Sequence, residues 1–582
     1  MTFKKLALYL KKLEATSSRL EITAILSIIL KEATVEEVDK LCYLILGYLA
    51  PPYQGIEFSL AEKMMVRAVS RAFKREEKEV MKLYKEKGDL GLVTEELSRS
   101  CPDLFKKPFL SVSQVHQRLL EIAQEGGTGS QERKISKIAA LIAAVDPLSG
   151  RFLVRIPLGR LRLGFSEITL LDALSWMISG DKRYRPQIEE AYNVRADIGF
   201  IARVIKEKGL SALKKVTLSL GTPIMPALCQ RLPTPEEMIK KMCPGSDDLV
   251  AVEPKYDGSR LEVHFRRRPL LTAMFTRNLE NVAAMFPDIA RALHQEVKAS
   301  NVVFDGEVVG YDPQTGRLLS FQKTIKRKRK HGVKEALLAI PLRYYCFDVL
   351  YYNGQTLINR PFSFRRRILE KILSPKNKTV LLSPQIITRD PEEIRKYHDE
   401  QIKKGLEGVV VKKWRAHYDV GKRGFTWVKF KEEGGRGRLA DSIDGVVMGY
   451  YRGRGRRAGL GIGAFLLGIR GKGDEFLTVS KIGTGLTDKQ WRQMKRYIDS
   501  KKVSRKPAAY RVDKNLFPDV WCSPSIVVEI EADNITRSPV HTAGLALRFP
   551  RLIRFRHDKS AEEATTIEEL RKLKTISEKV TA

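Results

Sequence analysis

The sequence contains little cysteine, and none of it is arranged in pairs. Six cysteines are scattered over 582 residues, and no two of them form a C-x-x-C pair. This distribution has neither the ligand spacing of a zinc site nor the pattern of a disulfide framework. We therefore expect reduced thiols throughout the protein.

The sequence also lacks a long apolar run. No uncharged stretch is long enough to span a bilayer, and the N-terminal Met1-Thr-Phe-Lys-Lys-Leu6 leads directly into an amphipathic pattern without a signal-peptide core. We expect no membrane span and no secretion signal. The protein should be intracellular, and cytoplasmic and associated with the nucleoid if its source is prokaryotic.

Acidic residues are outnumbered by basic ones. The chain has 69 Asp and Glu against 104 Lys and Arg, which gives a net charge of +35. Such a charge predicts a polyanionic partner, held partly by counterion release and bound less tightly as salt rises. Nucleic acid is the leading candidate. A membrane surface is the alternative, which the dispersal of the basic residues over the whole chain disfavours.

The length and the changes in residue pattern predict a multidomain protein of three parts. Residues 1–215 follow a helical period and are expected to form an all-α domain. Residues 216–432 alternate β-type runs with helices, as an α+β domain does. Residues 433–582 carry glycine-rich hairpin signals, short β runs and a final helix, which predicts an all-β barrel of the OB-fold kind. The helices expected in the first part include 113–124, 131–144, 166–178 and 185–208, and the β runs of the last part are 443–451, 462–470, 476–482 and 525–532.

One segment of the helical part departs from its pattern. Residues 151–164 present Arg155, Arg160 and Arg162 between glycines. Backbone amides and arginines in such a loop could bind phosphates, and a solvated turn explains the segment equally well.

Lys255 lies in a stretch, Glu253-Pro-Lys-Tyr-Asp-Gly-Ser-Arg260, that could make its amine a nucleophile. An ordinary lysine has a pKa of about 10.4 and is protonated at neutral pH. The apolar residues 249–252 and the nearby Arg260 would both disfavour the ammonium form, by desolvation and by charge repulsion. Taken alone, a lysine before an Asp-Gly hairpin is usually a solvated surface charge, so the other motifs of the chain have to decide.

Three further stretches place polar or aromatic residues in β-type surroundings. Arg277 follows a strand and could reach a sugar or a phosphate. Glu307 is embedded in the β run 304–309, where a carboxylate costs stability unless it binds a partner such as a ribose hydroxyl or a metal. Phe347 lies in the run 343–350, which is explained as a core strand.

Two segments before residue 432 carry charges beside apolar strands. Glu407, before the apolar run that ends at Lys412, is expected at the bend preceding a strand, and its hard oxygens suit Mg²⁺. In Trp427-Val-Lys-Phe-Lys431, Lys429 and Lys431 share one face of a strand because side chains alternate with a period of two. Two like charges side by side are unfavourable unless an anion lies between them. The pattern therefore predicts a phosphate at this face.

In their order along the chain, these stretches resemble the motif series of the covalent nucleotidyltransferases, which comprise ATP-dependent DNA ligases, RNA ligases and capping enzymes. The residues that carry the resemblance are Lys255, Arg277, Glu307, Phe347, Glu407, Lys429 and Lys431. Other segments resemble, more narrowly, the ATP-dependent DNA ligases of the archaeal and eukaryotic replicative type. They are residues 16–21 in the helical part, 451–459 and 481–485 in the OB-fold part, and the C-terminal motif 546–559. The resemblance thus covers essentially the whole chain.

The resemblance implies that nicks in duplex DNA are sealed in three steps, in replication, repair and recombination. Lys255 attacks the α-phosphorus of ATP and forms lysyl–AMP, AMP passes to the 5′-phosphate of the nick, and the 3′-hydroxyl displaces AMP. Mg²⁺ would be held by Glu407 and Glu307. The nucleotide-binding residues implied are Glu253 and Phe347 at adenine, Arg277 and Glu307 at ribose, Lys429 and Lys431 at the α-phosphate, Arg556 and Lys559 at the pyrophosphate, and Arg260 and Lys412 elsewhere in the pocket.

DNA contacts are expected from all three parts. Phe321 resembles the family residue that packs in the minor groove beside a nick, and Phe549 would be its counterpart in the barrel, with barrel core as the alternative. The basic run 326–330 would be a DNA-facing loop, although a localisation signal or a solvated loop also explains it. We expect a monomer acting on nicked duplex DNA, and the sequence leaves open whether a sliding clamp binds. The expected DNA-binding residues are Arg160, Arg162, Phe321, Arg327 and Phe549.

Two other functions fit part of the pattern. An RNA ligase or capping enzyme shares the lysyl–nucleotide chemistry but needs neither the large helical part nor the C-terminal motif. A non-catalytic, nucleotide-regulated DNA-binding protein would not need Lys255, Glu407 and Lys431 intact. An NAD-dependent ligase is disfavoured because the chain lacks a four-cysteine zinc cluster.

Overall fold

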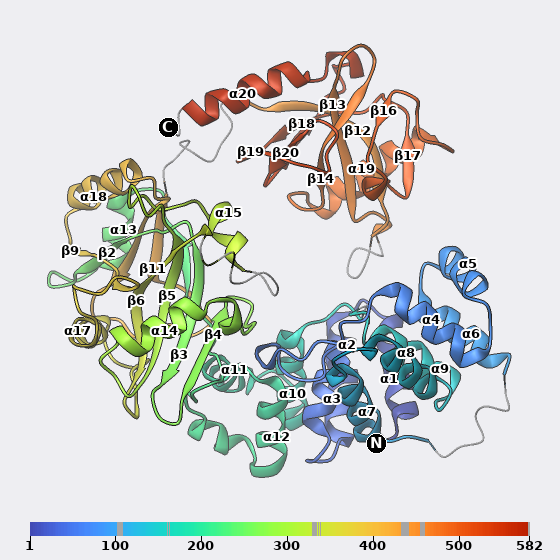
Figure 1. Ribbon diagram of the computed structural model, residues 1–582, viewed down its shortest axis with the longest axis horizontal. Coiled ribbons are helices and arrows are strands. Elements are labelled where there is room, and N and C mark those ends of the chain that lie inside the picture. The colour runs from blue at the N-terminus through green and yellow to red at the C-terminus, as the bar shows by residue number, and fades with distance from the viewer. Residues whose placement is uncertain are drawn as a thin grey trace. The chain divides into compact units, whose positions relative to one another are not determined.

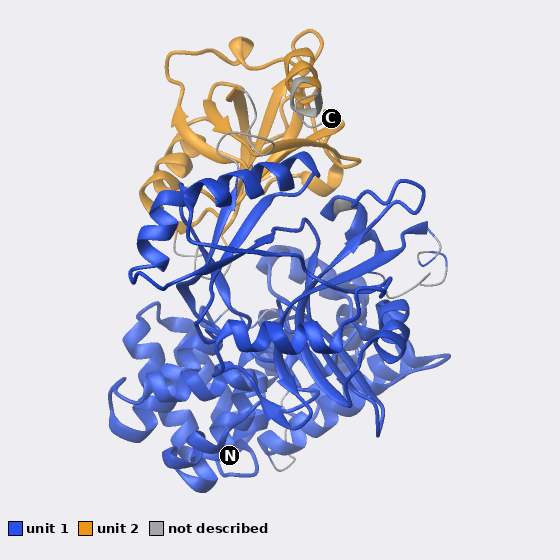
Figure 2. Ribbon diagram, turned by 90° about the vertical axis from the view of Figure 1, so that its left-hand side faces the viewer, with its two compact units in different colours: residues 1–431 blue, residues 432–582 orange. Residues whose placement is uncertain are grey.

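A computed structural model describes most of the chain. The described residues are 1–101, 109–159, 161, 163–328, 335, 337, 339–431, 441–453 and 460–579. The chain divides into two compact units, residues 1–431 and 432–582 (Figure 2). The finer division of the first unit at residue 215 stays a prediction.

The described part of residues 1–215 is helical, as expected, and the first strand among the described residues begins at Leu228. The helices bury a continuous apolar cluster that extends from Phe3 to Leu213. No helix in the described ranges is both long and apolar enough to cross a membrane. The helices are α1 (Phe3–Ala15), α2 (Arg19–Glu32), α3 (Val38–Leu46), α4 (Glu62–Phe73), α5 (Glu77–Lys87), α6 (Leu90–Arg99), α7 (Val112–Gln124), α8 (Ser130–Ile142), α9 (Pro147–Arg155), α10 (Glu167–Ser179), α11 (Arg185–Val194) and α12 (Ile198–Lys208) (Figure 1).

The single helix expected over 185–208 is in fact two helices, α11 and α12. Asp197 separates them, because its carboxylate accepts the backbone N–H of Phe200 at 3.0 Å and so caps α12. The same carboxylate accepts the hydroxyl groups of Tyr43 at 2.6 Å and Tyr53 at 2.8 Å. The sequence predicted one helix here because its apolar period continues past residue 195 and gives no sign of the polar junction at Asp197.

The expectation that residues 151–164 leave the helical pattern is wrong for their first part, because α9 continues to Arg155. The guanidinium of Arg155 is buried and pairs with Asp89 at 2.9 Å and Glu14 at 3.1 Å. Arg155 therefore stabilises the helical core and does not face a phosphate. Arg160 and Arg162 lie outside the described residues.

Residues 216–431 form two sheets with helices packed against them, which confirms an α+β arrangement. Helices α13 and α18 contact β11 and β10, whereas α14 and α17 contact β6 (Figure 1). One sheet has the order β1 (Leu228–Arg231), β11 (Arg423–Lys431), β10 (Gly408–Lys413), β2 (Val250–Pro254) and β9 (Ile386–Thr388). The other has the order β4 (Leu271–Thr276), β3 (Ser259–Arg266), β5 (Asn301–Gly310), β6 (Leu342–Tyr352) and β7 (Gln355–Thr356), with β8 (Val380–Leu382) also on β6. The helices are α13 (Pro235–Met242), α14 (Pro287–Glu296), α15 (Phe321–Thr324), α17 (Phe362–Ile372) and α18 (Pro391–Lys403).

The second unit is rich in strands. Its central strand is β12 (Ile443–Tyr451), which pairs with β13 (Ala464–Arg470), β17 (Val520–Cys522) and β18 (Val527–Glu531). The four β runs expected from the sequence correspond to β12, β13, β14 and β18. The final helix expected from the sequence is α20 (Ile567–Lys579). An all-β description is nevertheless incomplete, because α19 (Asp488–Ser500), which was not expected, buries Trp491, Met494 and Ile498. The strands are β12 (Ile443–Tyr451), β13 (Ala464–Arg470), β14 (Phe476–Ile482), β15 (Lys502–Val503), β16 (Tyr510–Arg511), β17 (Val520–Cys522), β18 (Val527–Glu531), β19 (Asn534–Arg537), β20 (Leu545–Arg548) and β21 (Arg551–Phe555).

Candidate active site

Lys255 lies in the short segment that connects β2 to β3. These strands belong to different sheets, so the segment is a crossing between sheets and not the hairpin that the Asp-Gly pair suggests. The backbone N–H of Lys255 donates to the carbonyl of Gly408 at 2.9 Å, and its carbonyl accepts the N–H of Glu407 at 3.1 Å. The Lys255 side chain is 22% exposed and its ammonium forms an ion pair with Glu407. The amine is thus accessible to solvent, while the backbone of Lys255 is held in place by its two hydrogen bonds.

Two glycines allow the close approach of the chain at this crossing. A Cβ at Gly408, where φ is +127°, would lie 2.3 Å from the carbonyl oxygen of Phe430. A Cβ at Gly258 would lie 2.4 Å from the carbonyl oxygen of Val308. Because either contact would force the backbone apart, glycine is required at both positions.

Glu407 precedes β10, as expected, and contacts two cations. Its Oε2 forms the pair with Lys255 and lies 2.7 Å from the ammonium of Lys431. Burial opposes ionisation of this carboxyl, but the two ammonium groups outweigh burial and lower its pKa to about 2. The carboxylate is therefore charged at neutral pH. The neighbouring Asp257 has a raised pKa, mainly because it is buried and also because Glu407 is close.

Glu307 lies within β5, directly across from Arg260 of β3. Burial raises the pKa of Glu307 to about 8, against the opposite effect of Lys255 and Arg260. At neutral pH this carboxyl is therefore largely protonated, and it can donate as well as accept a hydrogen bond. Glu407 and Glu307 thus differ in charge state although both lie near Lys255.

Glu253 of β2 is buried beside Lys412 of β10. The ammonium of Lys412 lies 2.8 Å from Glu253 Oε2 and donates to the carbonyl of Phe347 at 2.9 Å. The other oxygen, Glu253 Oε1, is buried and has no hydrogen-bond partner among the residues that the structure describes. The nearest guanidinium, that of Arg366, is 3.8 Å away. A buried carboxylate oxygen without a partner is costly, so this atom is a candidate acceptor for a ligand.

Arg260 is directed mainly at the protein interior. Its guanidinium pairs with both oxygens of Asp305, at 2.9 and 2.6 Å, and donates to the carbonyl of Ala227 at 2.7 Å. It also lies over the ring of Phe347, 5.6 Å from the centroid. Arg260 and Lys412 therefore position the aromatic ring and Glu253, and neither cation points outward at a phosphate.

The two lysines of β11 share a face, as the period of two predicts. Val428 and Phe430 are buried, whereas Lys429 and Lys431 are half-buried on the opposite face. Burial lowers the pKa of Lys429, and the nearby charge of Lys431 adds to the effect. Arg277 lies in the exposed turn after β4. Its guanidinium forms no hydrogen bond or ion pair with the part of the chain that the structure describes.

The two phenylalanines expected to contact DNA, Phe321 and Phe549, lie in different units of the chain. Phe321 begins α15, and its backbone N–H donates to Asp257 at 2.9 Å, which ties α15 to the Lys255 segment. Phe549 is 61% exposed in the turn between β20 and β21, so it does not belong to the core of the second unit. Its φ of +51° is strained for a non-glycine residue.

Arg327 does not face DNA, and the expectation from the basic run is wrong for this residue. Its side chain is fully buried, pairs with Asp288 at 2.7 Å and donates to the carbonyl of Ile340 at 3.1 Å. In a sequence, a run of charges is typical of a loop that is exposed to solvent or binds a ligand. Here the run contributes a structural arginine between α14 and the segment before β6.

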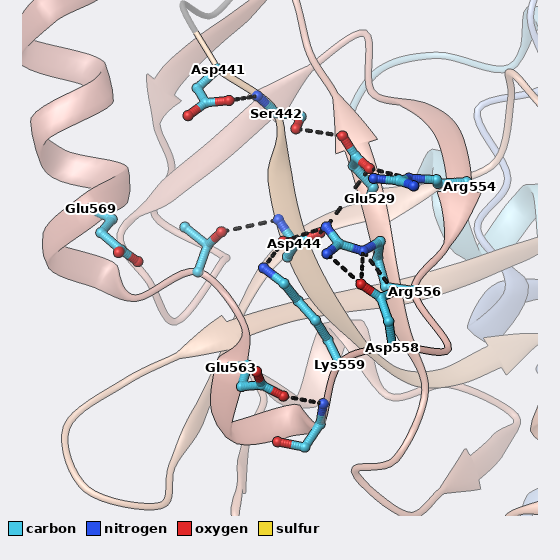
Figure 3. A network of polar contacts seen from close by, with 12 residues as sticks. Asp441, Ser442, Asp444, Glu529, Arg554, Arg556, Asp558, Lys559, Glu563 and Glu569 are labelled. Atoms are coloured by element: carbon cyan, nitrogen blue, oxygen red, sulfur yellow. Dashed lines mark hydrogen bonds and ion pairs between the residues drawn. The ribbon is translucent and has the colours of Figure 1, made fainter.

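Arg556 and Lys559 lie after β21 in the second unit, and both contact Asp444 of β12 (Figure 3). The guanidinium of Arg556 also pairs with Asp558 at 2.8 Å. Neither Asp444 nor Asp257 was singled out from the sequence. A signal existed for Asp444, since it is an acidic residue in an otherwise apolar β run, as Glu307 is.

Comparison with known proteins places this arrangement in a family. The family model for the ATP-dependent DNA ligase domain matches residues 226–431, that for the DNA ligase N terminus matches residues 2–175, and that for the ATP-dependent DNA ligase C-terminal region matches residues 458–559. A "Probable DNA ligase" of Dictyoglomus turgidum is 41% identical over 98% of this chain and 97% of its own length. The chain belongs to the ATP-dependent DNA ligases.

Other relatives match the ligase over nearly their full length. "DNA ligase 2" of Thermofilum pendens is 38% identical, over 98% of this chain and 96% of that protein. "DNA ligase" of Sulfurisphaera tokodaii is 36% identical, over 98% of this chain and 97% of that protein. A solved structure named Pmar-Lig_PreS3 is 18% identical, covers 94% of the ligase and 99% of its own chain, and has a TM-score of 0.53. At this identity the likeness concerns the fold alone.

The acidic residues of the ligase do not form a ready-made metal cage. Within the described ranges, His, Cys, Asp and Glu side chains nowhere gather in groups of three that could hold an ion. Mg²⁺ typically takes one or two protein carboxylates and completes its shell with water and phosphate oxygens. The charged oxygens of Glu407 fit such an ion, and the nearby carboxyl of Glu307 would fit it once it has lost its proton.

Proposed function

We propose that the ligase seals nicks in duplex DNA through a lysyl–AMP intermediate on Lys255. The observation that carries this proposal is the position of Lys255, whose amine meets Glu407 and Lys431 at the crossing between the two sheets. A nucleophile, a carboxylate and a phosphate-binding cation are the groups that phosphoryl transfer requires from a protein. The activity follows from positioning and charge neutralisation, with no catalytic triad.

In the first step, the amine of Lys255 forms a bond to the α-phosphorus of ATP while the bond to pyrophosphate breaks. The lysine must first leave its ion pair with Glu407 and give up a proton, since an ammonium has no free electron pair. Lys429 and Lys431 bind the α-phosphate, and their positive charge stabilises the transition state. The pKa of Lys429 is lowered mainly by burial, and the neighbouring charge of Lys431 adds to the effect, so an anion between the two lysines would be favourable.

The adenosine lies against Glu253 and Phe347 in this proposal. Glu253 Oε1, the buried oxygen without a partner, accepts a hydrogen bond from the 6-amino group of adenine. Phe347 stacks on the base, supported by Arg260 and by Lys412, which also holds Glu253 in place. The ribose hydroxyls bind Glu307, whose protonated carboxyl can donate, and Arg277.

Glu407 and Glu307 would hold Mg²⁺ with the phosphates of ATP. When bound, the ion neutralises phosphate charge and orients the triphosphate for in-line displacement. Glu407 would then hold the ion in place of the ammonium of Lys255, and the released lysine would lose its proton to water. This assignment rests on the ionised state of Glu407 and on the closeness of Glu307.

The later steps use DNA. AMP passes from Lys255 to the 5′-phosphate of the nick, and the 3′-hydroxyl attacks that phosphate and expels AMP. The net charge of +35 supports binding to the phosphate backbone. We assign Phe321 and Phe549 to the distorted duplex beside the nick. Phe549 is exposed and strained, and such strain is often kept at functional positions.

The proposal includes a domain organisation and a cellular setting. Residues 1–215, with Arg160 and Arg162, bind DNA, residues 216–432 carry the adenylation site, and residues 433–582 form a barrel of the OB-fold kind. The pairing of one strand, β12, with three others supports a strongly curled sheet. We further propose a monomer that acts in the cytoplasm on nicked chromosomal DNA in replication, repair and recombination, with a sliding clamp as a partner to be tested.

The decisive experiment is incubation with α-labelled ATP, GTP or NAD, followed by denaturing electrophoresis. Covalent label from ATP alone, released when nicked duplex DNA is added, is the expected result. Transfer to a broken RNA end, or label from GTP, would favour an RNA ligase or a capping enzyme. Absence of label from every nucleotide would favour a non-catalytic DNA-binding protein.

A further inference from the structure

The two cations assigned to pyrophosphate, Arg556 and Lys559, share one carboxylate. Asp444 Oδ2 accepts a hydrogen bond from the ammonium of Lys559 at 2.7 Å. The guanidinium of Arg556 lies 3.1 Å from both oxygens of Asp444. Figure 3 shows both side chains converging on Asp444 from the segment that follows β21. One anion therefore sets the relative position of two cations.

The Asp444 carboxylate is itself held in place by the backbone. Asp444 lies on β12, and its N–H donates to Thr565 Oγ1 at 3.0 Å while its carbonyl accepts the N–H of Thr565 at 2.8 Å. Its side chain is 14% exposed. Arg556 is anchored as well, because its N–H donates to the carbonyl of Val527 at 2.9 Å. The position of this carboxylate is thus a property of the sheet.

The second carboxylate on Arg556 has the opposite character. Asp558 pairs with the same guanidinium at 2.8 Å, but its side chain is 63% exposed. Ion pairs in solvent contribute little and break at small cost. An incoming phosphate therefore displaces Asp558 more easily than Asp444, and Arg556 can gain a phosphate without losing its alignment.

We propose that Asp444 is a positioning residue for the first step, which holds Arg556 and Lys559 as a pair suited to one pyrophosphate group. The inference rests on the proposed function and on the role at the leaving pyrophosphate that the resemblance to ATP-dependent DNA ligases implies for these two cations. Without an anion between them, the two cations would repel one another and lose their alignment, although Arg556 would keep its contacts with Asp558 and Glu529. With Asp444 present they are aligned before charge develops, and donors that need no rearrangement stabilise a transition state best. Asp444 itself touches neither ATP nor the reacting atoms.

The test compares Asp444→Asn with Asp444→Glu in the full-length ligase. Single-turnover formation of lysyl–AMP and its reversal by added pyrophosphate should both slow by about tenfold or more in Asp444→Asn, as expected when aligned charges are lost. Sealing of a pre-adenylated nick should stay within about twofold of wild type, because pyrophosphate takes no part in it. Asp444→Glu keeps both ion pairs but moves the carboxylate by one methylene, so it should fold normally and still slow the first step.

Two comparisons separate positioning from a general structural effect. Glu475→Gln removes an exposed partner of Arg511 in the same unit and should leave every step unchanged. Asp444→Asn should slow lysyl–AMP formation less in a protein that already carries Lys559→Ala than in the wild type. The reason is that Lys559, one of the two cations that Asp444 aligns, is already absent. The inference is overturned if folded Asp444 variants adenylate at the wild-type rate, if they adenylate faster, or if sealing of the pre-adenylated nick falls equally. Failure of the wild-type protein to form lysyl–AMP would instead overturn the proposed function.

Discussion

Lys255 and Glu407 are joined twice, once through the backbone and once through their side chains. The N–H of Glu407 donates to the carbonyl of Lys255 at 3.1 Å, and the carboxylate of Glu407 forms an ion pair with the lysine ammonium. The backbone contact keeps the two residues together when the side-chain contact breaks. Nucleotide binding can therefore release the amine without moving the segment between β2 and β3 that carries it.

Replacing Lys255 tests the nucleophile directly. Lys255→Ala should carry no covalent label after incubation with α-labelled ATP, because the amine proposed to attack the α-phosphorus is gone, and the neighbouring Lys431 is assigned to binding the α-phosphate. Lys255→Arg should be equally inactive, since a guanidinium stays protonated. Both variants should still bind nicked duplex DNA, because affinity comes from many dispersed cations. Label retained on either variant would show that the nucleophile lies elsewhere.

Glu253→Gln should weaken the selection of ATP over GTP. If Glu253 Oε1 accepts the 6-amino group of adenine, an amide at this position can instead donate to the 6-oxo group of guanine. Loss of a buried hydrogen bond that reads a base costs roughly 1–3 kcal/mol, or about one to two powers of ten in relative adenylation rate. The measurement is lysyl–nucleotide formation with each labelled nucleotide. Melting of the variant is followed in parallel, because Lys412 loses its charged partner; an unchanged ATP-to-GTP ratio would contradict the assignment.

Lys559→Ala should slow lysyl–AMP formation while sparing the final step. The lost contact to the leaving group is worth roughly 2–4 kcal/mol, or about two to three powers of ten in rate. A pre-adenylated nicked duplex, supplied without ATP, isolates phosphodiester formation from the first step. Sealing near the wild-type rate is expected. Equal impairment of both steps would mean that Lys559 serves folding or DNA binding.

Phe549→Ala should reduce sealing without reducing stability. The side chain is 61% exposed and its backbone has a φ of +51°, so truncation removes little packing, and Phe549→Gly should even relieve strain. Nick affinity and sealing of a pre-adenylated nick are measured beside the melting temperature. Phe517→Ala, at another exposed aromatic residue of the same unit, is the matched control. Full sealing by Phe549→Ala would remove this residue from the DNA interface.

Arg327→Ala should destabilise the ligase, in contrast to Arg277→Ala. The guanidinium of Arg327 is fully buried and pairs with Asp288, and removal of one partner of a buried ion pair costs about 3 kcal/mol. Arg277 is exposed in a turn, so its loss should change nucleotide affinity and leave unfolding unchanged. Denaturant unfolding of the two variants makes the comparison. Equal stability of both would show that the Arg327 contacts contribute nothing net.

Local pattern alone determined the elements of this protein. The helical period located α7, α8 and α10 to within two residues, and alternation placed Lys429 and Lys431 on one face of β11 with Val428 and Phe430 inside. Helical and strand periods are properties of neighbouring residues, so they can be read without the fold. Glu307 and Glu407 were also identifiable, because each is a charged residue set against an apolar run, whereas Lys255 was identified only through the resemblance of the whole motif series.

Only the tertiary structure decided which of these residues meet. The Asp-Gly turn after Lys255 reads as a hairpin, yet its strands enter different sheets, and this crossing brings Lys255 to Glu407. Arg327 reads as one of several solvated charges, yet Asp288 and two carbonyl groups enclose it. Asp444 contacts Arg556, which is 112 residues away in the sequence. Contacts between residues so far apart in the sequence depend on the order of the strands in a sheet and on which charged groups become buried. The local periodicity of the sequence contains neither kind of information.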